Sequence, residues 1–310
     1  MKKSLLALMI VSVFVTTACE DKETLQKLQN AEKAVVQLET DLKTAKAENE
    51  TLKAELAKAQ QNIPLQVEIA KIFDKSEVIK HKVDPKEEYA IEETKVTSFV
   101  TIPKTNLMWL NNILIKFAYD YNEEQGRKLQ NPTEQDLIKS REEIYQDMVK
   151  SAKEEPVFGY EESILSDFIG QRNNIVTFSM QPFSYSGGAH GLHHTSYINV
   201  DLNKKSVISL NDLVSEKNQA KLKEALWENY AVLRVDENGK YNGFADKKEF
   251  RISSEFYFGT SGIVFVYPPY ELGPYAEGYV EVDLPWYQAN ELLNLDYQRG
   301  EKDGFFKKEE

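Results

Sequence analysis

The chain has 310 residues, of which 28% are charged, and its 50 acidic side chains against 38 basic ones give a formal net charge of −12. This acidic excess repels phosphate, and no stretch rich in lysine and arginine compensates for it, so the composition argues against a nucleic-acid partner. Cys19 is the only cysteine. An intramolecular disulfide framework is therefore excluded, and burial of apolar surface has to stabilise the fold.

The N-terminus has the pattern of a bacterial lipoprotein signal. Two lysines precede an apolar stretch at 5–15, and small residues precede Cys19. The stretch is shorter than the roughly 20 apolar residues that a membrane-spanning helix needs. We expect residues 1–18 to be removed as a signal peptide, which leaves a net charge of −14, and Cys19 to be acylated. The alternative is an ordinary signal peptide with an incidental cysteine.

Acylation of Cys19 predicts the location of the protein. Lipid chains on this residue would hold the protein in the cell envelope, anchored to a bacterial membrane and facing the periplasm or the exterior. The sequence does not decide between the inner and the outer membrane.

Residues 19–63 are predicted to form a lipid-anchored coiled coil. Between residues 21 and 62 there is no glycine, proline or aromatic residue, which indicates one long helix. Apolar residues recur with a seven-residue period over five heptads. The a positions are Leu28, Val35, Leu42, Asn49, Leu56 and Ile63, and the d positions are Ala31, Leu38, Ala45, Leu52 and Ala59.

The charges beside this seam favour parallel chains. Asp41 and Glu48 at g positions face Lys46 and Lys53 at the next e positions of a partner helix, and Asn49 at an a position sets the register. We therefore expect a parallel homo-oligomer, dimer or trimer. A single solvated helix and an antiparallel hairpin with the rest of the chain are the alternatives. Pro64 ends the helix.

Beyond Pro64 the pattern changes to mixed strands and helices. Helices are predicted from Asn106, as a candidate cap, to Tyr121, from the Thr133 cap to about residue 153, at 211–233, and after Pro285. Strands are predicted at 66–73, 77–83, 92–102, 163–169, 175–185, 194–202, just after 203–205, near 256, at 263–267 and at 278–284.

This order of elements indicates the fold class. Strands and helices do not alternate as in a parallel βαβ fold, so we expect an α+β fold with a largely antiparallel sheet and packed helices. The expected domains are the coiled coil, an α+β lobe at 66–180 and a second α+β lobe at 181–310.

Three of the four histidines fall in one short stretch, as His190, His193 and His194. Clustered imidazoles suggest a metal site, because histidine is a common zinc ligand. In a tight turn, however, only two of these rings converge, and no neighbouring carboxylate or cysteine completes a ligand set. We therefore favour a glycine-rich turn between two strands, around Gly187 and Gly188, and expect no bound metal.

No familiar catalytic frame is present. The sequence has no HExxH, GxSxG, P-loop or GxGxxG motif. We expect neither enzymatic activity nor a cofactor. A metal-dependent hydrolase centred on the three histidines is the weakest alternative.

The segment 256–287 is unusually aromatic, with ten aromatic residues in thirty-two. Alternate rings are predicted to fill the core, whereas prolines and glycines force an exposed loop that carries Tyr270, Tyr275 and Tyr279. Exposed rigid aromatic side chains favour protein or sugar contacts, because they offer contact area with little side-chain entropy to lose. Packing against the protein's own sheet is the alternative.

Several ordered motifs together resemble a known family. They are YSGGAHG at 185–191, YINVDL at 197–202, ISLNDL at 208–213, GIVFVY at 262–267 and PYELGPYAEG at 269–278. In this order they resemble the extracytoplasmic domain of RsiV-type anti-sigma factors, which also accompanies some peptidoglycan deacetylases. The resemblance covers about residues 66–295 and is strongest from Tyr185 onward.

The resemblance implies a lysozyme-binding sensor domain, here on a lipoprotein. The chain lacks the cytoplasmic sigma-binding segment, the membrane-spanning helix and the deacetylase domain of those proteins, so neither direct sigma-factor control nor deacetylation is expected. The implied ligand is lysozyme or a similar cationic muramidase. We expect it to bind His190, His193, Tyr270, Tyr275 and Tyr279. The alternative is a lipoprotein that binds peptidoglycan or acts as an envelope scaffold.

Overall fold

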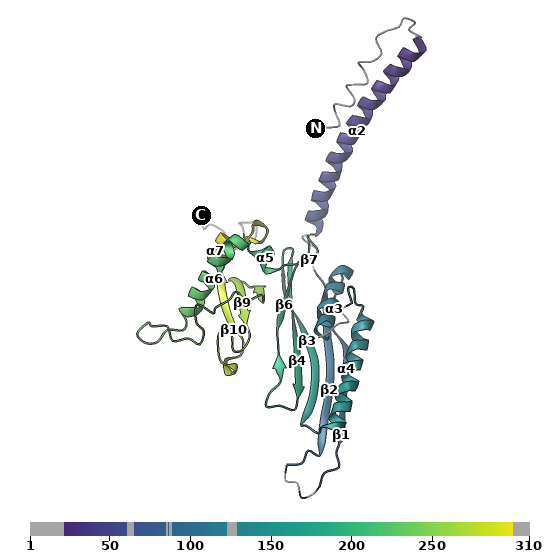
Figure 1. Cartoon of the computed structure of the whole chain (residues 1–310). Coiled ribbons are helices and arrows are strands. Elements are labelled where there is room, and N and C mark those ends of the chain that lie inside the picture. Colours follow the sequence, from purple (N-terminus) through teal and green to yellow (C-terminus); the bar gives the residue numbers. More distant parts are fainter. Residues whose placement is uncertain (1–21, 61–64, 85, 87–88, 123–128, 300–310) are drawn as a thin grey trace. The chain divides into compact units, whose positions relative to one another are not determined.

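The computed structural model describes residues 22–60, 65–84, 86, 89–122 and 129–299 of the chain (Figure 1). Contacts divide the chain into an N-terminal unit up to Ala59 and a second unit from Gln60 onward. Residues 1–18 with the expected signal peptide, Cys19 and the C-terminal residues 300–310 lie outside the described residues.

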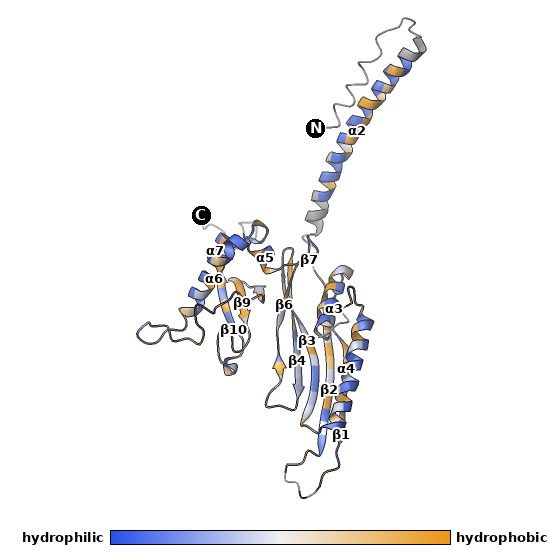
Figure 2. Ribbon diagram, viewed as in Figure 1, coloured by the Kyte–Doolittle hydropathy of each residue, from blue (hydrophilic) through white to orange (hydrophobic). Residues whose placement is uncertain are grey.

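In the described part of the N-terminal unit the chain forms helix α2 (Lys22–Gln60), which confirms the long helix predicted from the sequence. Bands of apolar and polar residues alternate along it (Figure 2). Its described side chains, at 26–53, are all exposed. The predicted seam residues are between 54% and 67% exposed: Leu28, Val35, Leu38, Leu42 and Leu52. The helix therefore presents an apolar stripe, while its pairing into a coiled coil stays a prediction.

The second unit begins with a seven-stranded sheet in the order β1-β2-β3-β4-β6-β7, with β5 paired to β4. Every pairing is antiparallel except that of β2 with β3, which is parallel. The strands are β1 (Val67–Lys80), β2 (Glu93–Thr105), β3 (Gly159–Arg172), β4 (Ile175–Ser186), β5 (Leu192–His193), β6 (Ser196–Asp201) and β7 (Ser206–Val207).

Two helices, α3 (Met108–Asn122) and α4 (Glu134–Glu154), make the connection that the parallel pair requires and pack on one face of this sheet (Figure 1). Because side chains alternate along a strand, one set of positions faces the helices and forms the first core. This set includes Val96, Val100, Ile164, Phe178 and Ile198. The opposite face of the sheet carries the alternate residues of each strand, which are more polar.

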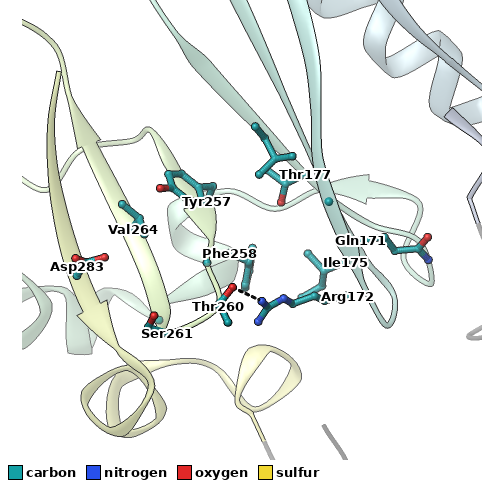
Figure 3. Close-up of a pocket in the computed structure, with 14 residues that line it drawn as sticks. Gln171, Arg172, Ile175, Thr177, Tyr257, Phe258, Thr260, Ser261, Val264 and Asp283 are labelled. Atoms are coloured by element: carbon teal, nitrogen blue, oxygen red, sulfur yellow. Dashed lines mark hydrogen bonds between the residues drawn. The ribbon is translucent and has the colours of Figure 1, made fainter. Parts of the chain in front are cut away.

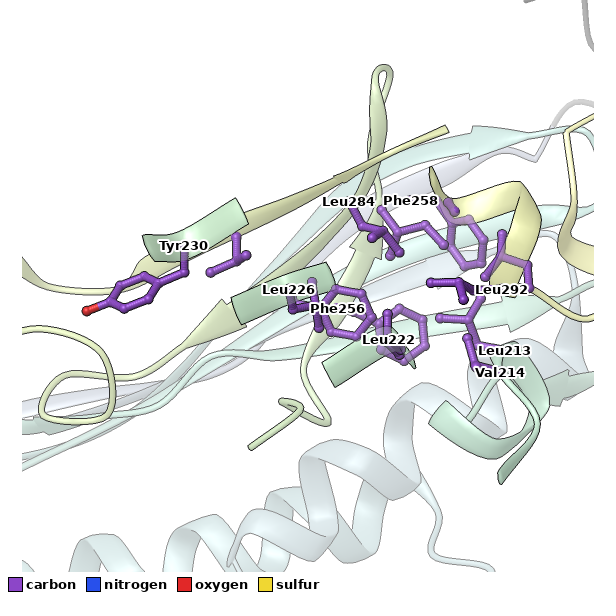
Figure 4. Close-up of a cluster of buried hydrophobic side chains, with 14 of the residues drawn as sticks. Leu213, Val214, Leu222, Leu226, Tyr230, Phe256, Phe258, Leu284 and Leu292 are labelled. Carbon is purple, nitrogen blue, oxygen red and sulfur yellow. The ribbon is translucent and has the colours of Figure 1, made fainter. Parts of the chain in front are cut away.

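The rest of the second unit surrounds a three-stranded antiparallel sheet in the order β10-β9-β8. Its strands are β8 (Phe256–Phe258), β9 (Gly262–Tyr267) and β10 (Val280–Pro285), and its helices are α5 (Leu210–Leu213), α6 (Glu216–Ala231) and α7 (Trp286–Leu292). Leucines from the helices meet phenylalanines from the strands in the second core (Figure 4). Two single-turn 3₁₀ helices lie at Tyr275–Glu277 and Leu295–Tyr297.

A buried polar seam joins the two sheets along β6. The side chain of Asn199, which is 1% exposed, accepts a hydrogen bond from Thr177 Oγ1 at 2.8 Å and donates one to the carbonyl oxygen of Phe256 at 2.6 Å. Beside it, Glu255 accepts the Tyr197 backbone N–H at 2.7 Å and the Ser196 hydroxyl at 3.3 Å. The Thr177 contact lies within the seven-stranded sheet, and the other three link this sheet to β8 or to the residue before it.

The predicted α+β class with a largely antiparallel sheet is confirmed. The Thr133 cap of α4 is also confirmed, because Thr133 and Asp136 form a capping box. Pro285 begins α7 as expected. The two cores divide the second unit near Val207, whereas the expected lobe boundary at 180/181 falls inside β4.

Several boundaries differ from the predictions. The two strands expected at 66–73 and 77–83 are one strand, β1, because β2 pairs with it along its whole length across a bulge. The strand expected at 163–169 extends over Gly159–Arg172 for the same reason, since β4 supplies partners throughout. Polar residues at these positions predict locally that the strand ends, but pairing with a neighbouring strand extends it.

Two helix predictions also need correction. The helix expected at 211–233 is interrupted: Ser209 caps α5 through Asp212, and α6 begins afresh at Glu216. Asn106 does not cap α3 as predicted. Its side chain accepts a hydrogen bond from the Gln66 backbone N–H at 3.2 Å. The first helical hydrogen bonds of α3 run instead to the Leu107 carbonyl.

The polar seam predicts a stability effect for Asn199→Ala. The substitution leaves the buried Phe256 carbonyl and the Thr177 hydroxyl without their partner, so we expect the free energy of unfolding to fall by about 2 kcal/mol. Urea denaturation followed by circular dichroism measures this change. Asn203→Ala, in an exposed turn of the same hairpin, is the matched control and should change stability little. Equal stability of the two variants would show that the seam contributes nothing.

Candidate functional site

The structure brings together the five residues expected to bind a ligand, although they come from two segments about eighty residues apart. His190 stacks on Tyr275 with 4.4 Å between ring centroids, and Tyr275 lies 5.8 Å from Tyr270. His193 lies 6.1 Å from Tyr275 and 5.4 Å from Tyr279. We call this continuous set of rings the aromatic surface.

One side of the aromatic surface is the turn between β4 and β5. Gly187 adopts φ = 83°, a conformation that favours glycine, and a Cβ added there would lie 2.4 Å from Val157 Cβ. The short strand β5 then pairs His193 with Phe183 of β4. The turn expected from the glycine-rich sequence therefore presents His190 and His193 on an exposed hairpin end.

The other side is the loop between β9 and β10. Tyr270 has φ = 74°, a left-handed conformation that is rare for a bulky side chain. Its backbone N–H donates to the Gly273 carbonyl at 2.8 Å, and its side chain remains 63% exposed. An ion pair between Arg234 and Glu277 ties the same loop to the end of α6. Such strain in an exposed aromatic residue is typical of functional loops.

Tyr279 connects the two segments. Its hydroxyl lies 3.3 Å from the His193 carbonyl oxygen, to which it donates, and 3.4 Å from His193 Nδ1. Burial raises the pKa of the Tyr279 phenol above its ordinary value. Tyr279 and Tyr275 are half-buried, whereas His190, His193 and Tyr270 are exposed.

A groove of about 530 Å³ adjoins the aromatic surface, on the face of the seven-stranded sheet opposite α3 and α4. We call it the sheet groove. Its lining residues from β2, β3 and β4 include Phe99, Glu161, Ser163, Leu165 and Phe183, and His193 and Tyr279 form part of its rim. These strand residues were not predicted as part of a site. The sequence shows which residues of one strand share a face, but only the order of the strands in the sheet brings residues of β2, β3 and β4 together in one groove.

The geometry of the three histidines offers no metal site. His190 and His193 contact tyrosine rings, and His194 Nε2 lies 3.7 Å from Glu255 Oε1. Among the residues that the structure describes, no three histidine, cysteine, aspartate or glutamate side chains lie close enough to hold an ion. What the site offers is aromatic contact area with hydrogen-bonding edges.

A second hollow of about 540 Å³ lies between the end of the β3–β4 hairpin and the outer face of the three-stranded sheet (Figure 3). Arg172 spans it and donates from Nη2 to Thr260 Oγ1 at 3.0 Å. Tyr257 and Asp283 line the facing wall. Burial and the neighbouring Glu281 carboxylate raise the pKa of Tyr257 well above its ordinary value. We call this second hollow the interlobe cleft. Its lining combines a guanidinium, hydroxyl groups and a carboxylate.

No described helix combines the length and apolar character needed to cross a membrane. No curated protein sequence is significantly similar to the chain. A family model does match at residues 203–287: DUF3298, described as a protein of unknown function. The match spans β7 to the start of α7 and so includes the loop with Tyr270, Tyr275 and Tyr279, but not the histidine turn.

Two solved structures share the fold. A DUF3298 family member from Bacteroides fragilis has a TM-score of 0.51 and 19% sequence identity, covering 74% of this chain and 94% of its own. A DUF3298 family protein from Pseudomonas aeruginosa has a TM-score of 0.55 and 17% identity, covering 77% of this chain and 99% of its own. At such identities the similarity shows the fold alone.

Neither description mentions lysozyme or an anti-sigma factor, so the resemblance to RsiV-type domains stays a prediction. The matched residues and the shared fold agree on a more general assignment. Residues 203–287 match the DUF3298 model, within an α+β fold that the chain shares with DUF3298 proteins from Bacteroides fragilis and Pseudomonas aeruginosa.

Proposed function

We propose that this protein is a non-enzymatic lipoprotein of the bacterial cell envelope that binds a basic protein, with lysozyme or another cationic muramidase as the first candidate ligand. The observation that carries the proposal is the aromatic surface. His190, His193, Tyr270, Tyr275 and Tyr279 form one set of rings at the exposed ends of two loops.

The chemistry of this surface suits a protein partner. Tyrosine is enriched where protein interfaces hold most of their binding energy, because its ring buries a large area and its hydroxyl still finds a hydrogen bond. The net charge of −14 expected after removal of residues 1–18 would accelerate encounter with a basic partner. The resemblance to the lysozyme-binding domain of RsiV-type anti-sigma factors points to the same class of ligand.

The interlobe cleft favours a second candidate function, binding of peptidoglycan fragments by an envelope scaffold. Arg172, Thr260, Tyr257 and Asp283 offer a guanidinium, a hydroxyl, an aromatic ring and a carboxylate within one hollow. Sugars and short peptides are recognised by such combinations of a few placed polar groups and apolar walls. Pelleting with purified cell wall, without any response to lysozyme, would favour this function.

Two further parts of the proposal concern the N-terminal region. Cys19 would carry the lipid that anchors the protein in the membrane. Helix α2 would associate in parallel with one or two further copies through its apolar stripe, with Asp41 and Glu48 facing Lys46 and Lys53 of a partner helix. The 54–67% exposure of the stripe residues supports this, since exposed leucines on a regular seam gain from burial.

Lysozyme binding is expected to depend on the tyrosines. Combined replacement of Tyr270, Tyr275 and Tyr279 by alanine should weaken binding of residues 20–310 to hen-type lysozyme by about 100-fold or more, because hot-spot residues each contribute about 2 kcal/mol or more. Isothermal titration calorimetry at two salt concentrations measures the affinity, with a muramidase assay alongside. Tyr287→Ala, which removes a 68% exposed tyrosine of α7, is the matched control.

The salt series adds an independent check. Association with a basic ligand should slow as ionic strength rises, because exposed charges are screened. Absence of heat and of muramidase inhibition with the wild-type protein at high micromolar concentration would refute lysozyme as the ligand. Unchanged affinity of the folded triple variant would instead refute the aromatic surface as its binding site.

Anchoring is expected to require Cys19. Cys19→Ser in the full-length chain should abolish incorporation of labelled palmitate and move the protein from the membrane fraction to the soluble fraction, because the acylated sulfur is lost. Thr16→Ser, a small change inside the predicted signal, is the control and should leave both properties intact. Membrane association of the serine variant at the wild-type level would rule out a lipid anchor at this residue.

Pairing of α2 is expected to fail when a charge enters the seam. Leu42→Glu should shift residues 20–310 from oligomer to monomer at micromolar concentration in analytical ultracentrifugation, because an unpaired carboxylate is costly to bury. Thr40→Glu introduces the same side chain on the outer face of the helix and should leave the mass unchanged. A monomeric wild-type protein would rule out the homo-oligomer.

A further inference from the structure

We propose that the sheet groove binds an arginine side chain of the basic partner, between the rings of Phe99 and Phe183 and against the carboxylate of Glu161. The inference rests on the proposed function and deepens it: the aromatic surface provides contact area, and the groove provides an anchor for a specific cationic group.

Strand register builds the floor of the groove. Ser163 of β3 is paired with Phe99 of β2 on one side and with Phe183 of β4 on the other, and Phe183 is paired with His193 of β5. Directly paired residues point to the same face of a sheet, with Cβ atoms about 4.5–5.5 Å apart. The row Phe99, Ser163, Phe183, His193 therefore lies across four strands. The small side chain of Ser163 lines the groove together with Phe99 and Phe183, its neighbours on the two adjacent strands.

A carboxylate stands beside this hollow. Glu161 lies two residues before Ser163 and so on the same face of β3. The Ser163 hydroxyl donates to Glu161 Oε1 at 3.2 Å, which orients the carboxylate toward the row. Glu161 is half-buried, so its charge is less screened by solvent than that of an exposed glutamate.

These groups match a guanidinium better than an ammonium. A guanidinium is planar, stacks on aromatic faces, is weakly hydrated and can donate two parallel hydrogen bonds to one carboxylate. None of the described residues that line the groove is a lysine or an arginine, so no side chain of the lining already supplies the cation. The flat face of the guanidinium would lie on the floor of the groove between Phe99 and Phe183, and the Glu161 carboxylate would accept its N–H groups.

The groove is continuous with the aromatic surface. His193 and Tyr279 belong to both, since they line the groove and contact each other through the Tyr279 hydroxyl. A partner bound on the tyrosine loop would therefore have a side chain within reach of the groove. The two features form one binding face, with broad contact on one part and a charged anchor on the other.

The test compares Glu161→Gln with Asp167→Asn. Both remove one carboxylate from the same face of β3, but exposed Asp167 lies outside the groove. Calorimetry of residues 20–310, which include every described residue, with hen-type lysozyme should give an affinity about tenfold or more weaker for Glu161→Gln and unchanged for Asp167→Asn. Lysozyme with its arginines blocked by phenylglyoxal should lose this dependence on Glu161, whereas lysozyme with acetylated lysines should keep it.

The outcomes separate the two proposals. Unchanged affinity of Glu161→Gln, together with weakened binding of Tyr275→Ala, overturns the groove and leaves the proposed function standing. If wild-type protein does not bind lysozyme, the proposed ligand is wrong, and acetyl-arginine amide becomes the probe. Shifts in the NMR signals of Ser163 and its neighbours that disappear in Glu161→Gln then support the groove, and no shifts overturn it.

Discussion

The second unit depends on a buried polar contact between its two sheets. Each sheet has its own hydrophobic cluster, one under α3 and α4 and the other under α6 and α7, although Ile175 of β4 belongs to the second cluster. The β6 seam adds the buried polar contact between the sheets, where Asn199 satisfies a buried hydroxyl and a buried carbonyl at once. A buried hydrogen bond is worth little net energy, but it is costly to break, so the seam specifies how the sheets meet.

This joint positions the candidate site. The turn that carries His190 connects β4 and β5 of the larger sheet. The loop that carries Tyr270 and Tyr275 connects β9 and β10 of the smaller sheet. Glu255 binds the start of β6 through the Tyr197 N–H, and Tyr279 donates to the His193 carbonyl a few residues before it in the chain. The aromatic surface is thus a property of the assembled sheets, since each segment alone would present isolated rings.

The candidate site combines aromatic contact area with an adjoining groove. The rings are exposed or half-buried, the histidines contact tyrosines, and the adjoining groove combines phenylalanines with one oriented carboxylate. Under the proposed function, such a face would contact a basic protein, because aromatic rings offer contact area and a carboxylate attracts cationic groups. If α2 pairs in parallel, two such faces emerge from the same end of one coiled coil, and avidity for a repeated ligand follows.

The sequence by itself determined the features that depend on neighbouring residues: the long helix with its heptad pattern, the Thr133 and Pro285 helix starts, the α+β class and the exposure of Tyr270, whereas Tyr275 and Tyr279 are half-buried. These follow from local periodicity and capping, which a single chain displays directly. Only the tertiary structure decided the unbroken β1, the division between α5 and α6, and the row that places Phe99 and Phe183 on either side of Ser163. Strand order and register are set by pairing between segments distant in the chain, and local pattern carries little information about them.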